Sequence, residues 1–443
     1  MEKNRTFIGT CEAYTYDGLG VVHHEDFVFF VPRLLVGETA ELATTKWKKR
    51  FGYARIVKLL ETSKHRQEPI CSVAKQCGGC QLLHMDEAEQ KIFKEDKVRG
   101  CFRMNAGIDV DVLPIITSNP TVGYRNKVQV PVDVVNNQVE MGFYHSRSNQ
   151  IVSYDYCHMQ SALSNAITKD IKKWITQSHC GKAFRHVLVK HAHKSGEVMV
   201  CFVVKKHEFK GLNEIVNHLL ETYPDIKTIT TIENRRSDNV ILDGTERILY
   251  GEGYIQEELL GKEFRISAKS FFQINPYTTA KLYQKALELA KLDETQTVID
   301  LYCGTGTIGL LASEKCKKVY GIEIVEEAIK DAKKNAEINQ IHNISFLVGD
   351  AGKGANQLIK NHIQPNVVIV DPPRKGCSKD TLDAIVKMNP ERIVYISCDP
   401  ATLARDCKYL LEKEYNLEIV QPFDMFPNSV HVETVILLCR AVC

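Results

Sequence analysis

The chain has 443 residues, 44% of them hydrophobic and 25% charged, and at roughly 100 to 200 residues per domain this length suggests two to four domains. It has no apolar run long enough to cross a bilayer and no charged start followed by an apolar signal stretch. We therefore expect a soluble, cytoplasmic protein without a membrane partner, and we expect a monomer. The formal net charge of +2 is close to balanced, so any surface that binds nucleic acid must consist of local clusters of basic residues. Fifteen Cys residues, an odd count without a secretion signal, argue against a disulfide scaffold and favour thiol chemistry or metal binding.

Residues 1–60 have the pattern of short strands separated by turns. Turn signals around Gly18 and Gly37 flank the apolar run 27–31, which predicts a small β-barrel. Residues 46–55 interleave Lys and Arg with aromatic rings, the combination that neutralises phosphates and stacks on bases. A solvated basic hairpin explains the same residues equally well.

Three short motifs of this first segment follow one another in a recognisable order: Gly18-Leu19-Gly20-Val21-Val22, Phe29-Phe30-Val31-Pro32 and Gly37-Glu38. Together they resemble a TRAM domain, an RNA-binding barrel found in RNA-modifying enzymes. The resemblance implies that residues 1–60 form a TRAM-like RNA-binding β-barrel, and it favours the nucleic-acid interpretation of the basic hairpin.

Residues 61–262 combine a Cys-rich start with a helix over about 87–104 and strand-like runs such as 127–132. The pattern predicts a mixed α+β middle domain without fixing the order of its elements. Residues 124–127 and 143–145 mix aromatic and cationic side chains, which slightly favours contact with RNA over an ordinary strand edge.

The Cys-rich start places Cys71, Cys77 and Cys80 in a C-x5-C-x2-C pattern, with two glycines between the last two. Glycine lets the backbone turn sharply enough to aim two thiolates at one centre, and three clustered thiolates need a fourth ligand. Cys157 is the best candidate for it. The spacing is compatible with zinc and with a [4Fe-4S] cluster, and three unrelated buried cysteines remain an alternative. Because the pattern is not C-x3-C-x2-C, radical cleavage of S-adenosylmethionine is disfavoured.

Residues 263–443 alternate between strand and helix patterns, which predicts a parallel α/β sheet. The run 325–336 places apolar residues at helical spacing with charges between them, as in an outer-layer helix. The alternating segments are 298–301, 309–313, 318–322, 325–340, 344–348, 367–370, 392–397 and 434–438.

A glycine loop follows the strand 298–301 and turns into a helix. Its glycines allow close approach of the backbone to a ligand, and Glu323, about twenty residues on, is placed to accept hydrogen bonds from ribose hydroxyls. Asp350, after the strand 344–348, is placed to reach an adenine ring, although a cap at the strand end explains it equally well. The Asp-x-x-x-Gly-x-Gly spacing from Asp300 favours S-adenosylmethionine over NAD.

Three further residues are predicted at the carboxyl-end edge of the same sheet. Asp371 begins the motif Asp-Pro-Pro-Arg after an apolar strand, and because a related motif binds target amines in amino-methylating enzymes, nitrogen methylation stays open. Cys398 follows the next strand, and Glu433 opens the last one. Methylation of carbon 5 of uracil needs a thiolate that adds to carbon 6 and a base that removes the carbon 5 proton. A buried core thiol and a solvated strand residue are the alternatives for Cys398 and Glu433.

The motifs of the C-terminal half are Phe271-Phe272-Gln273-Ile274-Asn275, Asp300-Leu301-Tyr302-Cys303-Gly304, Asp371-Pro372-Pro373-Arg374, Ser397-Cys398-Asp399-Pro400 and His431-Val432-Glu433-Thr434. In this order they resemble the RNA uridine-5 methyltransferase family, including its bacterial ribosomal RNA enzymes with an iron-sulfur cluster. The resemblance covers nearly the whole chain. Two departures are Asp399, where many members carry Asn, and Asp350, at a position that varies.

The resemblance implies three parts: a TRAM-like barrel (1–60), a middle domain with the Cys cluster (61–262) and a Rossmann-like class I methyltransferase domain (263–443). It implies Cys398 as nucleophile and Glu433 as proton acceptor. The implied contacts to S-adenosylmethionine are Gln273, Tyr302, Glu323 and Asp371, to which Asp350 is added from its place after the strand 344–348. The implied ligands of a [4Fe-4S] cluster are Cys71, Cys77, Cys80 and Cys157.

The expected substrate is a flipped or unpaired uridine in RNA. The combination of cluster and TRAM-like barrel favours 23S ribosomal RNA, and a tRNA uridine is the alternative. A nitrogen methyltransferase and a noncatalytic RNA-binding redox protein are more distant alternatives.

Overall fold

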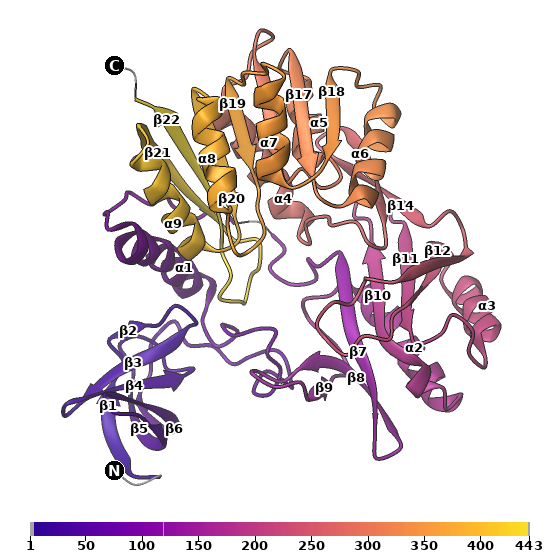
Figure 1. The fold of residues 1–443 in the computed structure, drawn as a ribbon. Coiled ribbons are helices and arrows are strands. Elements are labelled where there is room, and N and C mark those ends of the chain that lie inside the picture. The colour runs from indigo at the N-terminus through magenta and orange to yellow at the C-terminus, as the bar shows by residue number, and fades with distance from the viewer. Residues whose placement is uncertain (1–3, 118, 442–443) are drawn as a thin grey trace.

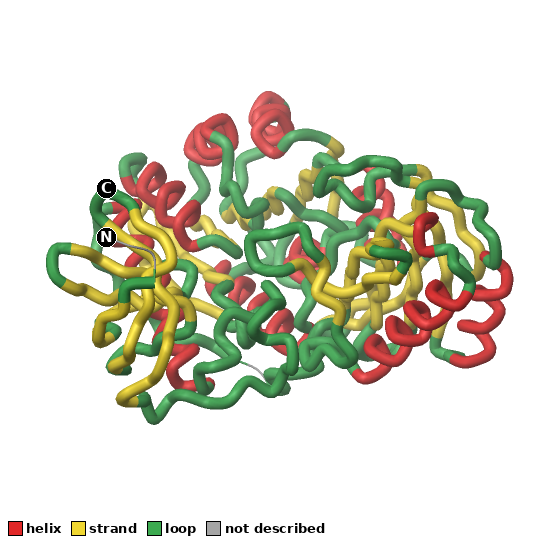
Figure 2. Tube along the Cα trace, turned by 90° about the horizontal axis from the view of Figure 1, so that it is seen from below, coloured by secondary structure: helices red, strands yellow, loops and turns green. Residues whose placement is uncertain are grey.

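The computed structural model describes residues 4–117 and 119–441 and arranges them around three large β-sheets (Figure 1). The first sheet lies at the lower left of that view, the second at the lower right and the third at the top. Viewed from below, the first two sheets lie at opposite ends of the molecule with a loop-rich segment between them (Figure 2). Within the described ranges, no helix is both long and apolar enough to cross a membrane.

The first sheet has six strands in the order β1-β5-β6-β4-β3-β2 and encloses a core of its own. Phe7, Val22, Phe29 and Leu42 are buried in that core because alternate side chains of each strand point inward. The exposed residues 48–50 form the turn of the predicted basic hairpin, between β5 and β6. The strands are β1 (Thr6–Thr10), β2 (Ala13–Tyr14), β3 (Leu19–His24), β4 (Phe27–Pro32), β5 (Thr39–Trp47) and β6 (Phe51–Glu61).

A connection over residues 62–86 leads from the first sheet to helix α1 (Glu87–Cys101). The Asp86 side chain caps α1 by accepting a hydrogen bond from the Glu89 amide at 2.9 Å. The helix continues as the π-helical turn η1 (Phe102–Ala106), so the predicted helix over about 87–104 is confirmed and extends slightly further. Val98 and Phe102 are buried against the third sheet.

The middle sheet has seven strands in the order β13-β12-β11-β10-β7-β8-β9. Helices α2 and α3 pack on one of its faces, where Val128, Val130 and Val132 of β7 are buried with them. The alternate residues of β7 therefore point to the opposite face. The elements are β7 (Lys127–Val135), β8 (Gln138–Tyr144), β9 (Ile151–Ser153), α2 (Ala162–Gln177), η2 (Gly181–Ala183), β10 (Phe184–His191), β11 (Val198–Val204), α3 (Leu212–Thr222), β12 (Ile226–Glu233) and β13 (Thr245–Tyr250).

The third sheet follows a two-stranded hairpin and a helix and has the order β18-β17-β16-β19-β20-β22-β21. Its first five strands are parallel, and β22 pairs antiparallel with both β20 and β21. The elements are β14 (Tyr254–Leu259), β15 (Lys262–Ser267), α4 (Pro276–Ala290), β16 (Thr297–Leu301), α5 (Thr307–Ser313), β17 (Lys318–Glu323), α6 (Glu326–Ile338), β18 (Ile344–Val348), α7 (Ala351–Lys360), β19 (Val367–Val370), α8 (Lys379–Met388), β20 (Arg392–Ser397), α9 (Pro400–Leu411), β21 (Tyr415–Phe423) and β22 (Glu433–Arg440).

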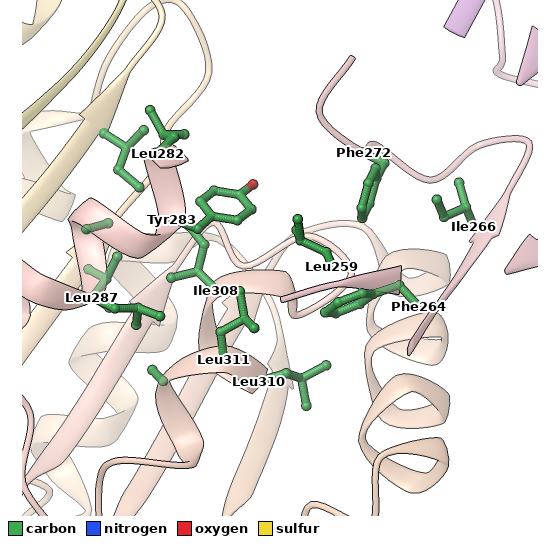
Figure 3. Packing of buried hydrophobic residues seen from close by; sticks show 14 of the residues in the cluster. Leu259, Phe264, Ile266, Phe272, Leu282, Tyr283, Leu287, Ile308, Leu310 and Leu311 are labelled. Carbon is green, nitrogen blue, oxygen red and sulfur yellow. The ribbon is translucent and has the colours of Figure 1, made fainter. Parts of the chain in front are cut away.

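Both faces of this sheet are covered, which explains why its strands read as continuous apolar runs. Val367 and Ile369 of β19 point to the face covered by α4, α5 and the β14–β15 hairpin, where Leu282, Ile308 and Phe264 belong to one buried cluster (Figure 3). Val368 and Val370 point to the other face, covered by α7, α8, α9 and η1.

The predicted strand and helix alternation of residues 263–443 is confirmed, with Glu433 as the first residue of the last strand. β21 and the helices α4, α7, α8 and α9 were not predicted individually.

Candidate active site

The turn after β16 has a backbone that L-residues rarely adopt. Tyr302 has a φ of 64°, Gly304 of 53° and Gly306 of 80°. Glycine takes left-handed conformations without steric cost, and Gly306 is the residue from which α5 begins. The turn therefore exposes backbone without intervening side chains at two of these three positions, as the sequence predicted for a ligand-binding loop.

Asp300 connects this turn to α5. Its Oδ2 atom accepts a hydrogen bond from the Gly309 amide at 2.9 Å, and the side chain is buried. Burial, with the nearby negative charges of Asp371 and Glu323, raises the pKa of Asp300 to about 8. Its Oδ1 atom is buried and has no hydrogen-bond partner among the described residues.

Glu323, the last residue of β17, reaches across to the same turn. Its Oε2 atom accepts a hydrogen bond from the Gly304 amide at 3.2 Å, and its Oε1 atom accepts one from the Val325 amide at 2.9 Å. The carboxylate is thus fixed beside the glycine turn, where the sequence predicted an acid that holds ribose hydroxyls.

Asp350 has an observed structural role. Its Oδ1 atom accepts hydrogen bonds from the amides of Gly352 and Lys353 at 3.1 and 3.2 Å, so it caps the N-terminus of α7. This is the strand-end cap that the sequence left open as the alternative. Burial is the main cause of the raised pKa of Tyr302, and the negative charge of Asp350 adds to it. The Tyr302 hydroxyl lies 3.3 Å from the Thr381 hydroxyl.

The three residues predicted at the carboxyl-end edge are brought together there. Asp371 follows β19 and Cys398 follows β20, and both are half-buried. Glu433 is only 3% exposed. Burial, followed by the negative charge of Asp371, raises the pKa of Glu433 to about 8 against the opposing effect of Arg374. Burial alone raises the pKa of Asp371 to about 7.

Cys398 faces both acids and one cation. Burial and the negative charges of Glu433 and Asp371 raise the pKa of its thiol to about 12, and the guanidinium of Arg374 acts against them. A thiol, an acid of raised pKa and an arginine therefore share one rim of the sheet, next to the glycine turn.

Tyr283 of α4 belongs to this rim and was missed from the sequence. Its hydroxyl is hydrogen-bonded to the Gln273 side chain and faces Asp371, Asp300 and Glu433, which together with burial raise its pKa. Both Tyr283 and Gln273 are 5% exposed. The helix α4 was not predicted either, so the available signal was only a tyrosine in an apolar context, since a buried tyrosine hydroxyl usually needs a polar partner.

Asp399, the departure from the family pattern, caps α9. Its Oδ1 atom accepts hydrogen bonds from the amides of Ala401 and Thr402 at 2.9 and 3.2 Å. Asn caps helices as well as Asp does, so the departure retains the cap. Asp399 is also hydrogen-bonded to Tyr16, which lies in the turn between β2 and β3. The first sheet therefore reaches the residue next to Cys398.

Helix α1 holds the loop that leads to Glu433. The Gln90 Oε1 atom accepts a hydrogen bond from the Asn428 amide at 2.9 Å. The Lys94 Nζ atom lies 2.6 Å from Asp424 Oδ1, and Lys97 Nζ donates to the Val430 carbonyl at 2.7 Å. The three side chains are four and three residues apart and so lie on one face of the helix.

Comparison with known proteins identifies the family. The family model described as tRNA (Uracil-5-)-methyltransferase matches residues 91–441. The chain belongs to this family. It is 42% identical to an RNA methyltransferase of Oceanobacillus iheyensis over 98% of this chain and 96% of the relative, and 40% identical to one of Clostridium tetani over 99% and 97%.

Among solved structures, the tRNA (uracil-54, C5)-methyltransferase of Pyrococcus abyssi in complex with S-adenosyl-L-homocysteine is similar, with a TM-score of 0.76 at 28% identity over 97% of this chain and 99% of that one. The protein therefore has a mixed α/β methyltransferase fold and is an S-adenosylmethionine-dependent RNA methyltransferase.

The predicted cluster ligands of this methyltransferase line one cavity. Cys71, Cys77, Cys80 and Cys157 surround a space of about 70 Å³, together with Arg125. Burial and the three other thiols raise the pKa of Cys80 to about 12, against the effect of Arg125. Within residues 4–117 and 119–441, no three His, Cys, Asp or Glu side chains are close enough together to hold a metal ion as they stand.

Proposed function

We propose that the protein methylates carbon 5 of a uridine in RNA, with Cys398 as the nucleophile and Glu433 as the base. The observation that carries this proposal is the meeting of Cys398, Glu433 and Asp371 beside the glycine turn. A nitrogen methyltransferase needs the acid but neither the thiol nor a second buried carboxyl. Membership of the uracil-5 methyltransferase family supports the same reaction.

Bound S-adenosylmethionine would supply an electrophilic methyl group. We assign its binding to Gln273, Tyr302, Glu323, Asp350 and Asp371, which are the residues expected from the sequence. The fixed carboxylate of Glu323 at the Gly304 amide suits a pair of ribose hydroxyls. The unpartnered, buried Oδ1 atom of Asp300 adds an acceptor for a donor group of the ligand.

The reaction uses the chain's own groups in sequence. The Cys398 thiolate adds to carbon 6 of the uracil, which makes carbon 5 nucleophilic enough to take the methyl group. Glu433, as carboxylate, then accepts the proton of carbon 5, and the bond between sulfur and carbon 6 breaks. Arg374 supports the first step because its charge opposes the high pKa of the thiol. The step transfers one methyl group and releases one proton.

A covalent trap tests this mechanism. An RNA that carries 5-fluorouridine at the target position should remain attached to the protein after methyl transfer, because a base cannot remove fluorine as a proton. We expect a stable adduct on Cys398 that forms only with S-adenosylmethionine and is missing from Cys398→Ala. If methyl transfer proceeds and no adduct forms, the thiol mechanism is wrong.

We further propose that Cys71, Cys77, Cys80 and Cys157 hold a [4Fe-4S] cluster. A single zinc ion needs all four sulfurs at about 2.3 Å from one point, whereas a cluster takes one thiolate at each of four irons. Four thiols spread around one cavity fit the second arrangement better. No step of methyl transfer requires this group, so its role would be to fix the surrounding loops.

The proposed domain boundaries are 1–60, 61–262 and 263–443, and β1–β6 would form the TRAM-like RNA-binding barrel. The exposed basic turn at residues 48–50 supports RNA contact there. Tyr16 and Lys97, with the Lys97 Nζ atom 3.7 Å from the centre of the ring, connect this sheet to the active site.

We propose 23S ribosomal RNA as the substrate, on the combination of a TRAM-like barrel with a cluster. The likeness to the Pyrococcus abyssi tRNA enzyme favours a tRNA uridine as second candidate. Mapping of 5-methyluridine in ribosomal and transfer RNA from cells with and without the protein decides between them. Loss of the modified base from 23S RNA supports the first, and loss from tRNA alone supports the second.

A further inference from the structure

A groove lies on the face of the middle sheet that α2 and α3 leave uncovered. Its volume is about 420 Å³, within the range of ligand pockets. Strands β7, β8, β9 and β10 and the loop after β12 line it. The side chains that the argument uses are Asp133, Tyr144, Arg185 and His186.

His186 lines this groove, and one of its buried ring nitrogens is unpaired in the described part of the chain. The side chain is 5% exposed, and its Nδ1 atom has no hydrogen-bond partner among the described residues. A buried polar atom without a partner costs free energy, so a ligand that supplies the missing hydrogen bond is favoured. Burial and the charge of Arg185 lower the pKa of His186 to about 4, so the ring is neutral at physiological pH.

Tyr144 provides an aromatic surface at the same groove and is 42% exposed. Its backbone carbonyl accepts a hydrogen bond at 3.0 Å from Gly78, in the loop of the Cys cavity. A Cβ atom at Gly78 would lie 3.2 Å from that carbonyl oxygen, so glycine permits this close approach. The loop that carries Cys77 and Cys80 therefore fixes the strand that presents Tyr144.

The charges of the groove suit a neutral base edge better than a phosphate. The Nη1 atom of Arg185 donates to Asn234 Oδ1 at 2.7 Å and to the Val240 carbonyl at 2.9 Å, so Arg185 is engaged with the loop. Asp133 offers a carboxylate, which repels phosphate and accepts hydrogen bonds from an exocyclic amino group.

Strand β7 leads from the active site to this groove. Immediately before it, Asn126 donates hydrogen bonds from its amide to the Ile274 carbonyl at 3.0 Å and from Nδ2 to the Gln273 carbonyl at 2.9 Å. The groove residues Gln129 and Asp133 follow three and seven residues later. At about 3.3 Å per residue this is roughly 10 to 23 Å along the strand, a few nucleotides of extended RNA.

We propose that this groove binds one unstacked base of the RNA segment beside the target uridine, and that it prefers a base with an exocyclic amino group. That the ligand is RNA rests on the proposed function. The base stacks on Tyr144, and its polar edge faces His186 and Asp133. The groove thereby contributes to the choice of RNA sequence at a position that the catalytic residues do not contact.

Binding of short oligoadenylate and oligouridylate of equal length, measured by fluorescence anisotropy, tests the proposal without methyl transfer. We expect the wild-type protein to prefer oligoadenylate and Tyr144→Ala to weaken that binding about tenfold, since a stacked base contributes strongly to single-strand affinity. Asp133→Asn should reduce the preference while the stack remains. The matched control Tyr250→Ala, an exposed tyrosine at the other edge of the sheet, should change neither affinity.

Equal affinity for the two oligomers, or unchanged binding by Tyr144→Ala, overturns the proposal. Methyl transfer to RNA from cells that lack the protein is measured in parallel, where Tyr144→Ala should raise KM and leave kcat unchanged. If the wild-type protein transfers no methyl group and the Tyr144-dependent preference persists, the proposed reaction fails and the groove stands. If methyl transfer is normal and the preference is missing, the groove fails alone.

Discussion

The active-site rim and the four-cysteine cavity contain the same reactive group in opposite surroundings. At the rim, Cys398 faces Glu433, Asp371 and the guanidinium of Arg374. In the cavity, four thiols face one another among mostly apolar and aromatic side chains, with Arg125 as the cation. Burial raises the thiol pKa in both places, so burial alone does not distinguish them.

The difference lies in what can accept a proton. A single thiol beside a buried carboxyl can add to a carbon atom and pass a proton to its neighbour. The described residues that line the cavity include no Asp or Glu, so the four thiols have no such partner there. The favourable way to ionise them together is to bind a positively charged centre. Cysteines of similar burial therefore have different chemistry in the two regions. Substitutions in each region test the chemistry that we assign to it.

The largest expected effect is that of Cys398→Ala, which should reduce kcat for methyl transfer by about 10⁴-fold or more because it removes the nucleophile. Cys439→Ala is the matched control, since Cys439 lies in β22 of the same sheet and is half-buried as Cys398 is. It should leave turnover unchanged. Full activity of Cys398→Ala would instead favour nitrogen methylation through Asp371.

Lys94→Met tests how helix α1 holds the loop that leads to Glu433. The Lys94 ammonium and Asp424 form a buried ion pair, and removal of one partner leaves the other charge unpaired. We expect the free energy of unfolding to fall by about 3 to 5 kcal/mol, measured by chemical denaturation. Lys91→Met, which removes an exposed pair with Glu87 on the same helix, should cost less than about 1 kcal/mol. The double variant Lys94→Met/Asp424→Leu should recover much of the loss, and no recovery would contradict the unpaired-charge explanation.

Glu433→Gln replaces the carboxyl group with an amide of similar shape that cannot carry a negative charge. The folded-state pKa of Glu433 is about 8, above its ordinary value of 4.5, so the folded protein binds the proton more tightly than the unfolded chain. Stability from this group is complete below about pH 4.5 and is lost as the pH rises towards 8. The variant lacks this loss, and at pH 8 we expect its advantage in unfolding free energy to be about 3 to 4 kcal/mol larger than at pH 5.

Thermal unfolding between pH 5 and pH 9 measures this effect, with Glu418→Gln as the control because Glu418 is exposed on the same sheet. A constant difference between Glu433→Gln and the wild type across this range would show that the carboxyl is not held in a destabilising environment. The same variant should bind RNA and still be slow in turnover, because the amide cannot accept the carbon 5 proton.

The sequence predicted the rim because parallel strands end at one edge of a sheet. Asp371 and Cys398 each follow an apolar strand, and Glu433 opens the last one, so local patterns were enough to bring them together. Tyr283 and Lys94 were missed because their partners, Gln273 and Asp424, are reached only after distant elements pack. No local pattern specifies such contacts.

In other parts of the fold, too, local patterns were predictable from the sequence and contacts between distant elements were not. The alternation of residues 263–443 was predictable from apolar periodicity, whereas the docking of α1 on the third sheet was not, since Val98 and Phe102 give no indication of which core they enter. The Cys71, Cys77 and Cys80 spacing predicted one site, and the fourth thiol, Cys157, does line the same cavity. An acid at the end of a strand is a weak signal for a ligand contact. The hydrogen bonds that Asp350 accepts are those of a helix cap.

The smallest expected effect on turnover is that of Cys80→Ser, and it sharpens the contrast with Cys398 most directly. If the cavity holds a cluster, the wild-type protein purified without oxygen should contain about four irons per chain, and the variant should lose most of them. Because no proton or methyl group passes through the cavity, kcat for methyl transfer should fall by no more than about tenfold. Cys180→Ser, outside the cavity, should retain the iron. An iron-free wild-type protein would remove the cluster from the proposal and leave the rim chemistry intact, whereas a 10⁴-fold loss in Cys80→Ser would mean that the two thiol environments are not separate.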